Sequence, residues 1–242
     1  MLKRILALVM LCPVLVLAQA AEPAGKLTTE SIIKRTLEGR LGGVKISAVT
    51  KTPYLGLYEV RVDSEILYTD EKMSYIFSGN IIDGKSMQNL TEKRMRELSV
   101  IKWEDLPLEG AFKTVRGNGK RVLAVFSDPN CPYCKRFEKD LAKVDDITIY
   151  TFLYPILSQD SHEKAKAVWC AADRSKAWSE LMLNGTVPAA GRCDTPIEKN
   201  LGFAHKNRIT GTPTLVFASG ARVPGAVSSD QLEKLLAQET RK

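Results

Sequence analysis

The chain has 242 residues, of which 44% are hydrophobic and 26% charged, and its formal net charge is +7. The basic residues are spread along the chain rather than clustered with aromatic residues, so nucleic acid is excluded as an expected partner. The length exceeds the commonest domain size of roughly 100–150 residues, and we therefore expect two unequal domains.

The first twenty residues have the organisation of a secretory signal peptide. Lys3 and Arg4 precede an apolar run, Ile5–Leu17, and Ala18-Gln19-Ala20 provides a small-x-small cleavage site. This run is too short for a membrane-spanning helix, which needs about 20 residues. We therefore expect residues 1–20 to be removed on secretion. Four cysteines remain after removal, and an even number in an oxidising compartment suggests two disulfides.

Residues 21–84 are expected to form a small first domain. A helix is predicted over Leu27–Leu41, where apolar residues recur at helical spacing. Three strands with partly alternating apolar residues follow, at Leu57–Val62, Glu65–Thr69 and Ser74–Ile82, and predict an antiparallel sheet. A cysteine-free unit of about 60 residues buries only about 60% of its chain surface, which leaves it marginally stable alone. We therefore predict that this domain dimerises with a second copy.

The segment Gly79–Ser86 matches the phosphate-binding loop pattern G-x-x-x-x-G-K-S. A nucleotide-binding loop joins a buried parallel strand to an apolar helix, whereas Leu90–Trp103 downstream is charged on most faces. We therefore interpret the segment as a turn that leaves the last strand of the first domain.

Residues 85–108 are expected to form a linker helix between the domains. Asn89–Val100 is rich in strong helix formers and has little apolar surface, which is typical of a solvent-bridging helix. Pro107 and Glu109-Gly110 mark the entrance to the second domain.

The second domain is expected to span residues 109–242 and to mix strands with helices. A strand, a helix and a second, parallel strand are predicted, with the strands at 122–126 and 147–154. The next helix is expected to start with Asp160 or Ser161 as its N-cap. The remaining predicted elements are three strands and a final helix, at 111–115, 214–217, 221–227 and 229–238. The whole chain is thus predicted to be an α+β protein.

The motif Cys131-Pro132-Tyr133-Cys134 lies between the two parallel strands. Asp128-Pro129-Asn130 ends the first of these strands, and Pro132 suits the first turn of a helix. Cys131 is therefore expected at or near the N-cap, where unpaired N–H groups and the helix dipole favour a thiolate over a thiol. Cys131 is the candidate nucleophile. Cys134, one turn further on the same face, is expected to be less exposed and to act as the resolving thiol.

The other two cysteines, Cys170 and Cys193, are expected to form a structural disulfide. Closing this loop would stabilise the fold by roughly 3 kcal/mol. We expect this disulfide to be buried and the Cys-x-x-Cys pair to be exposed. A zinc site is the alternative, but the chain could complete one only with these cysteines and with His162 and His205, which are widely separated. Each histidine is more simply a surface residue, so we expect no metal.

This constellation resembles the thioredoxin superfamily, in which a Cys-x-x-Cys at a helix start is followed much later by a turn such as Gly211-Thr212-Pro213 before a hairpin. With the signal peptide, the first domain, the linker helix and the pair Cys170 and Cys193, the mature chain is similar to the DsbC/DsbG family of periplasmic disulfide isomerases. The resemblance implies a thioredoxin-like second domain with a helical insertion. It also implies a periplasmic location and a V-shaped homodimer whose two active sites face a cleft that holds unfolded substrate.

The resemblance further implies the roles of residues near the cysteines. Pro213 is expected to be cis and to lie beside Cys131, with Thr212 before it. Pro132, Tyr133, Thr212 and Pro213 are the residues expected to contact substrate.

The mechanism implied by the resemblance is thiol–disulfide exchange. Cys131 attacks a wrong disulfide of a misfolded secreted protein, and Cys134 or a second substrate thiol then displaces it. Reduced Cys131 requires an electron donor, for which the family implies a DsbD-like membrane reductase, and no cofactor is expected. A DsbG-like sulfenic-acid reductase and chaperone, or a DsbA-like thiol oxidase, stays an alternative. Val125 stands six residues before Cys131, where reducing thioredoxins carry a buried acid, which disfavours a general reductase.

Overall fold

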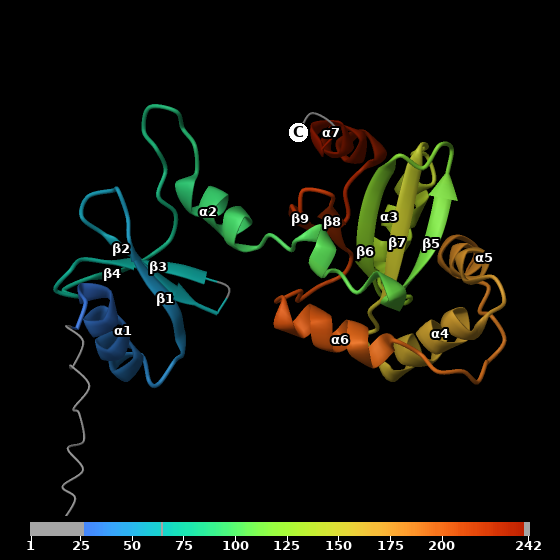
Figure 1. Cartoon of the computed structure of the whole chain (residues 1–242), viewed down its shortest axis with the longest axis horizontal. Helices are drawn as coiled ribbons and strands as arrows, with labels where there is room; N and C mark the ends of the chain where they lie inside the picture. Colours follow the sequence, from blue (N-terminus) through green and yellow to red (C-terminus); the bar gives the residue numbers. More distant parts are fainter. Residues whose placement is uncertain (1–26, 64, 240–242) are drawn as a thin grey trace, which may run out of the picture.

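The computed structural model describes residues 27–63 and 65–239. The predicted signal peptide, residues 1–20, lies outside these ranges. Figure 1 shows two separate domains connected by a segment that contains the short helix α2. Within the described part of the chain, no helix is long and apolar enough to cross a membrane.

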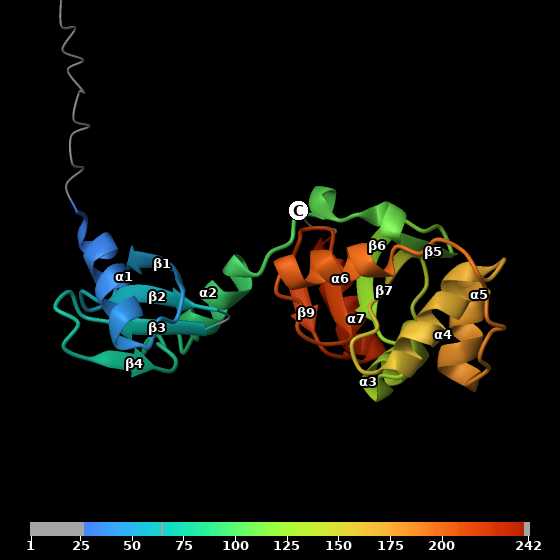
Figure 2. The ribbon, with the colours of Figure 1, turned by 90° about the horizontal axis from the view of Figure 1, so that it is seen from below.

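The first domain is a four-stranded antiparallel sheet with the helix α1 (Thr29–Arg40) on one face (Figure 2). Thr28 caps α1 by accepting a hydrogen bond from the backbone N–H of Ser31. The strands are β1 (Ile46–Lys51), β2 (Tyr58–Val62), β3 (Glu65–Thr69) and β4 (Ile76–Ser78), in that order across the sheet. Its core is formed by side chains of α1, β1 and β2, namely Ile33, Leu37, Ile46, Tyr58 and Val60. Sequence analysis missed β1, because its half-exposed, mixed sequence lacks the apolar alternation of the other strands.

The helix α2 (Leu90–Leu98) packs on the first domain through polar contacts. The Tyr68 hydroxyl lies 2.8 Å from the Thr91 hydroxyl, and the Arg94 guanidinium donates to the buried Glu59 carboxylate at 3.0 Å. These contacts explain how a helix with little apolar surface is held in place. The helix begins soon after Gly79–Ser86, which forms a turn in which the Asp83 carboxylate accepts from the Lys85 and Ser86 N–H groups.

The chain between α2 and the second domain is also anchored. The Ile101 N–H donates to the Gly220 carbonyl at 3.0 Å, and the side chains of Ile101 and Leu106 are buried in the second domain. Two short 3-10 turns follow, at Trp103–Asp105 and Leu108–Gly110. The predicted linker range, 85–108, therefore contributes packed residues to both domains.

The second domain contains a five-stranded mixed sheet in the order β5-β7-β6-β8-β9. The central strands β6 and β7 are parallel, and the other neighbours are antiparallel. This is the predicted strand–helix–strand unit, with α3 (Pro132–Leu141) as its connection. The strand bounds are β5 (Ala111–Arg116), β6 (Arg121–Ser127), β7 (Ile147–Leu153), β8 (Thr214–Phe217) and β9 (Arg222–Pro224).

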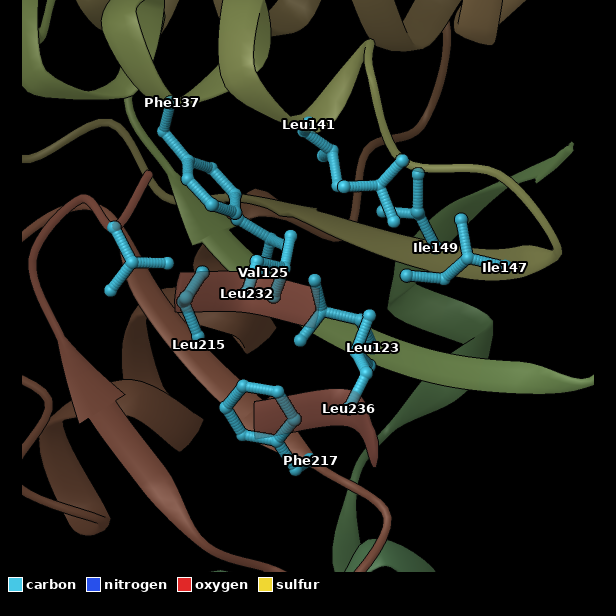
Figure 3. Close-up of a cluster of buried hydrophobic side chains, with 12 residues drawn as sticks. Leu123, Val125, Phe137, Leu141, Ile147, Ile149, Leu215, Phe217, Leu232 and Leu236 are labelled. Atoms are coloured by element: carbon cyan, nitrogen blue, oxygen red, sulfur yellow. The ribbon is translucent and has the colours of Figure 1, made fainter. Parts of the chain in front are cut away.

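Helices cover both faces of this sheet. On one face, Leu123 and Val125 of β6 pack with apolar side chains of α3 and of α7 (Ser229–Glu239), as Figure 3 shows. On the other face, Phe126 stacks on Phe152, with ring centroids 4.5 Å apart, and on Phe203 of α6 (Ile197–Lys206) at 6.0 Å. Successive side chains of β6 point to opposite faces of the sheet, and both faces are covered by helices. This is why the strand is an unbroken apolar run.

The remaining helices follow β7. They are α4 (Gln159–Cys170), α5 (Arg174–Ser179) and a π-helical turn, Glu180–Asn184. The N-cap of α4 is Ser158, whose hydroxyl accepts from the Ser161 N–H, so the prediction of Asp160 or Ser161 was wrong. Sequence analysis also missed α6, because polar Asn200 and Gly202 interrupt its apolar pattern, although Asn200 is buried.

Candidate active site

Cys131 occupies the N-cap position of α3, directly after the turn that leaves β6, and Pro132 is in the first turn. This is the position that the sequence predicts. Both cysteines of the motif are free thiols. Cys131 is 4% exposed and Cys134 is completely buried, so the expectation that Cys134 is the less exposed of the two is confirmed, although neither thiol is widely open to solvent.

The loop before β8 closes over Cys131. The Cys131 thiol donates a hydrogen bond to the Thr212 carbonyl, with 3.3 Å between Sγ and O. The Thr212–Pro213 peptide bond is cis, as the resemblance implied. The structure therefore brings Cys131, Cys134, Thr212 and Pro213 together from segments about 80 residues apart in the sequence.

Cys134 lies beneath Cys131 in an apolar environment. Burial raises the pKa of the Cys134 thiol to about 12, and the charge of Cys131 adds to the increase. Hydrogen bonds to the Ser127 hydroxyl, the Asp128 backbone and the Thr212 hydroxyl oppose it without cancelling it. Cys134 is thus a neutral thiol at neutral pH. This suits a resolving thiol, which reacts only after a mixed disulfide has formed, rather than the attacking nucleophile.

Asp128 is a residue of this site that sequence analysis treated only as the end of a strand. Its side chain is fully buried, and its carboxylate accepts four hydrogen bonds at 2.8–3.0 Å. The donors are the N–H groups of Asn130, Ile156 and Leu157 and the hydroxyl of Ser161. Asp128 therefore fixes the turn before Cys131 against the segment after β7. An aspartate directly after a buried strand and before proline was the only signal in the sequence.

A second layer of polar contacts surrounds Asn130. Its side-chain amide donates to the Asp160 carboxylate at 2.7 Å and accepts from the Lys164 ammonium at 2.9 Å. The ion pair with Lys164 and the bond from Asn130 hold the pKa of Asp160 below its ordinary value. These contacts explain why α4 is capped by Ser158. Asp160 and Ser161 are instead engaged with Asn130 and Asp128 of the active-site turn.

Pro132 and Tyr133 form the exposed part of the motif. The Tyr133 side chain is 60% exposed, and the Arg136 guanidinium lies 5.5 Å from the centre of its ring. Ile156 and Leu157, whose N–H groups bind Asp128 in the turn before Cys131, are 39% and 53% exposed and add apolar surface to that of Tyr133. Such surface suits contact with an unfolded polypeptide.

Glu138 is a second buried acid that sequence analysis missed. It lies one turn after Cys134 on α3, and its carboxyl accepts a hydrogen bond from the Trp178 indole at 2.7 Å. Burial raises the pKa of Glu138, against the opposing effects of Trp178 and Arg116. A charged residue on an otherwise polar helix gives no sign of burial in the sequence.

Cys170 and Cys193 are joined by a disulfide, with 5.7 Å between their Cα atoms. The expectation about exposure was wrong, because Cys170 is half-buried and Cys193 is exposed, whereas the thiols of the Cys-x-x-Cys pair are buried. The reason is that Cys193 lies in an irregular segment outside the core, while the sheet and the loop before β8 enclose α3. His162 lies 3.3 Å from Glu198 and links α4 to α6 rather than contacting the cysteines.

Comparison with known proteins agrees with this architecture. Residues 108–240 match the family model of a thioredoxin-like domain, and residues 16–92 match that of the disulfide bond isomerase protein N-terminal domain. The "Probable thiol:disulfide interchange protein DsbC" of Bordetella pertussis is 42% identical over 219 residues, which cover 90% of this chain and 76% of that protein. The chain belongs to the DsbC family.

Other relatives extend the match. The thiol:disulfide interchange protein DsbC of Escherichia coli K12 is 27% identical to this DsbC-family protein over 206 residues, covering 82% of this chain and 84% of that one. Among solved structures, a disulfide interchange protein from Neisseria gonorrhoeae is 42% identical with a TM-score of 0.54. It aligns over 55% of this chain and 98% of its own, so the likeness concerns part of the DsbC-family chain.

Proposed function

We propose that this DsbC-family protein is a periplasmic thiol–disulfide isomerase that rearranges or reduces wrong disulfides of misfolded secreted proteins. The observation that carries the proposal is the placement of Cys131 at the N-terminus of α3, facing the Thr212–Pro213 loop, with Cys134 buried one turn below it. A helix N-terminus provides unpaired N–H groups that stabilise a thiolate, and the thiolate is the nucleophile in disulfide exchange.

The reaction starts when the Cys131 thiolate attacks one sulfur of a substrate disulfide. A mixed disulfide forms and the other substrate sulfur leaves as a thiolate. If another substrate thiolate attacks the substrate sulfur of the mixed disulfide, Cys131 is released unchanged and the substrate is isomerised. If Cys134 attacks the sulfur of Cys131 instead, the Cys131–Cys134 disulfide forms, the substrate gains two electrons and the protein must be reduced again. A DsbD-like membrane reductase would supply those electrons, and no cofactor takes part.

The residues around the cysteines fit binding of an extended chain. The Thr212–Pro213 loop presents the Thr212 carbonyl beside Cys131, and Pro132 and Tyr133, which follow Cys131 in the chain, offer exposed surface. A chaperone activity would use the same apolar surface without the thiols. Sulfenic-acid reduction and thiol oxidation are the alternative reactions of this site, and the reduction potential of the cysteine pair separates an oxidase from an isomerase.

The test of the function uses two variants. Cys131→Ser is expected to abolish repair of a scrambled disulfide protein and formation of mixed disulfides, because the attacking sulfur is missing. Cys134→Ser is expected to accumulate the mixed disulfide, detectable by mass spectrometry, because the buried thiol that resolves it is absent. Repair that survives in Cys131→Ser would contradict the proposal.

The homodimer is proposed to form through the first domain. Strand β4 is an edge of the sheet, and its Ile76 and Phe77 side chains are 42% and 50% exposed, beside Tyr75 at 71%. An edge strand with exposed apolar side chains is a template for pairing with a second copy. Phe77→Glu is therefore expected to convert a dimer into a monomer in light scattering. Leu55→Glu, at a loop residue that is 94% exposed, is the matched control.

A further inference from the structure

A groove of about 680 Å³ begins beside the active site and runs toward the first domain. At the near end it is lined by Ile156 and Thr210. The Ile156 N–H donates to Asp128, and Thr210 lies two residues before Thr212, whose carbonyl contacts the Cys131 thiol. At the far end the groove reaches Asp63 in the turn between β2 and β3, whose backbone carbonyl accepts from the Arg208 guanidinium.

The character of the groove changes along its length. Its near half has an apolar floor, because Tyr154 and Ile209 are buried there and are linked by a hydrogen bond of 2.7 Å from the Tyr154 hydroxyl to the Ile209 carbonyl. Ile156, which is 39% exposed, adds an apolar wall. This half can accept an apolar side chain that lies close to the attacked cysteine.

The far half is cationic. Lys206 and Arg208, at and just after the end of α6, are exposed and line the groove with the imidazole of His205. Within residues 27–63 and 65–239, neither Lys206 nor Arg208 forms an ion pair with a carboxylate, and Arg208 donates to a backbone carbonyl. Asp63 is the acidic side chain among the lining residues. Among the described residues that line the groove, the positive charges of Lys206 and Arg208 are therefore accompanied by one carboxylate, that of Asp63.

We propose that this groove binds the substrate segment that flanks the attacked cysteine and favours segments in which acidic residues lie farther from the cysteine than an apolar one, in either chain direction. The proposal rests on the proposed function, since it assigns a substrate preference to the same site. The distance is compatible, because the six Cα–Cα steps from Lys206 to Thr212 span at most about 22 Å, a length that an extended peptide of similar size covers. Charge complementarity of this kind acts mainly on the rate of association and on specificity.

The experiment compares disulfide-linked peptide dimers that differ only in the charge of residues flanking a central cysteine. One peptide carries glutamates two to five residues away on both sides, and the other carries lysines, so that binding in either chain direction is sampled. The rate at which the reduced Cys134→Ser protein forms a mixed disulfide with each peptide is followed by mass spectrometry. Each rate is divided by the rate of the same peptide with a small neutral thiol, which removes differences in intrinsic reactivity.

The glutamate peptide is expected to react about three- to tenfold faster than the lysine peptide at low ionic strength. The ratio should fall toward one in about 0.5 M salt, because exposed charges are screened over a few ångströms there. Lys206→Glu, and Lys206→Glu with Arg208→Glu, should remove or invert the preference. Lys199→Glu, on the exposed side of α6 outside the groove, should retain it.

Equal normalised rates for the two peptides, or a preference that survives Lys206→Glu with Arg208→Glu, would overturn the groove assignment. Reaction with the neutral hydroxyethyl disulfide separates this result from failure of the proposed function. If the reduced Cys134→Ser protein exchanges with that small disulfide but does not discriminate between the peptides, only the substrate preference is wrong. If it exchanges with neither, the thiol–disulfide function itself is wrong.

Discussion

The two cysteine pairs of this protein differ in burial, and the difference is the reverse of the expected one, in which the disulfide is buried and the Cys-x-x-Cys pair is exposed. Cys131 and Cys134 are buried thiols, whereas the Cys170–Cys193 disulfide is half-buried at one end and exposed at the other. Greater access to solvent is therefore not what marks the Cys-x-x-Cys pair. Cys131 lies at a helix N-terminus with a backbone carbonyl against its sulfur, while Cys193 lies in an irregular loop that the disulfide ties to α4. The backbone groups around its sulfur atoms, more than their exposure, distinguish the proposed reactive pair from the structural pair.

The largest expected effect concerns the structural pair. Replacing Cys170 and Cys193 together by serine should lower the free energy of unfolding by about 3 kcal/mol, because the unfolded chain regains the entropy of the open loop. Urea unfolding followed by circular dichroism measures the change. Mixed-disulfide formation at Cys131 should persist at temperatures where this variant is folded.

A loss of exchange in that folded double variant would contradict the separation of roles between the two pairs. A stability equal to that of the wild type would instead show that the disulfide does not constrain the unfolded chain.

A smaller effect is expected from the turn that holds the reactive pair. Asp128→Asn replaces one acceptor oxygen by an amide that cannot accept from the N–H groups or the hydroxyl around it. The variant should lose about 2 kcal/mol of stability, since buried donors are left unpaired. Its exchange rate should also fall, because the turn before Cys131 is no longer fixed. Urea unfolding and stopped-flow thiol exchange give the two values.

The matched control for that change is Asp160→Asn. The Asp160 side chain is 63% exposed and its partners are the Lys164 ammonium and the Asn130 amide, so the loss of stability should be below about 1 kcal/mol. Equal losses in the two variants would show that burial of Asp128 is not what anchors the turn.

Near pH 9 the smallest expected effect, below about 1 kcal/mol, is a pH dependence from Cys134. Burial raises its pKa to about 12 in the folded protein, above the value in the unfolded chain, which is about 8.5. Above the unfolded value the unfolded chain loses its proton first, so stability is complete below about pH 8.5 and decreases at higher pH. The decrease should be about 1.4 kcal/mol per pH unit between the two pKa values.

This dependence is measured by urea unfolding of reduced Cys131→Ser and of Cys131→Ser with Cys134→Ala at pH 8, 9 and 10. The comparison cancels the titration of other groups, such as Tyr68 and Tyr154, whose pKa values burial also raises. Parallel stability curves for the two variants would mean that the Cys134 thiol is not desolvated as the structure indicates.

The sequence by itself determined the local parts of the reactive site. The apolar run of β6, the turn at Asp128-Pro129-Asn130 and the proline after Cys131 predicted a buried strand and a cysteine at a helix N-cap, and both are observed. These features depend on residues close together in the chain, where helix and strand preferences act directly. The cis peptide before Pro213 followed from family resemblance rather than from the residues alone.

The tertiary structure decided what surrounds these elements. The hydrogen bonds of Asp128 join residues up to 33 positions apart, and Ser161 and Asp160, the predicted caps of α4, bind Asp128 and Asn130 instead. The burial of Cys131, the exposure of Cys193 and the helix α6 with its buried Asn200 also depend on which segments pack together. The sequence around a polar residue is the same whether its side chain contacts water or a hydrogen-bond donor from a distant segment of the chain. Only the packing of the domain decides which of these it meets.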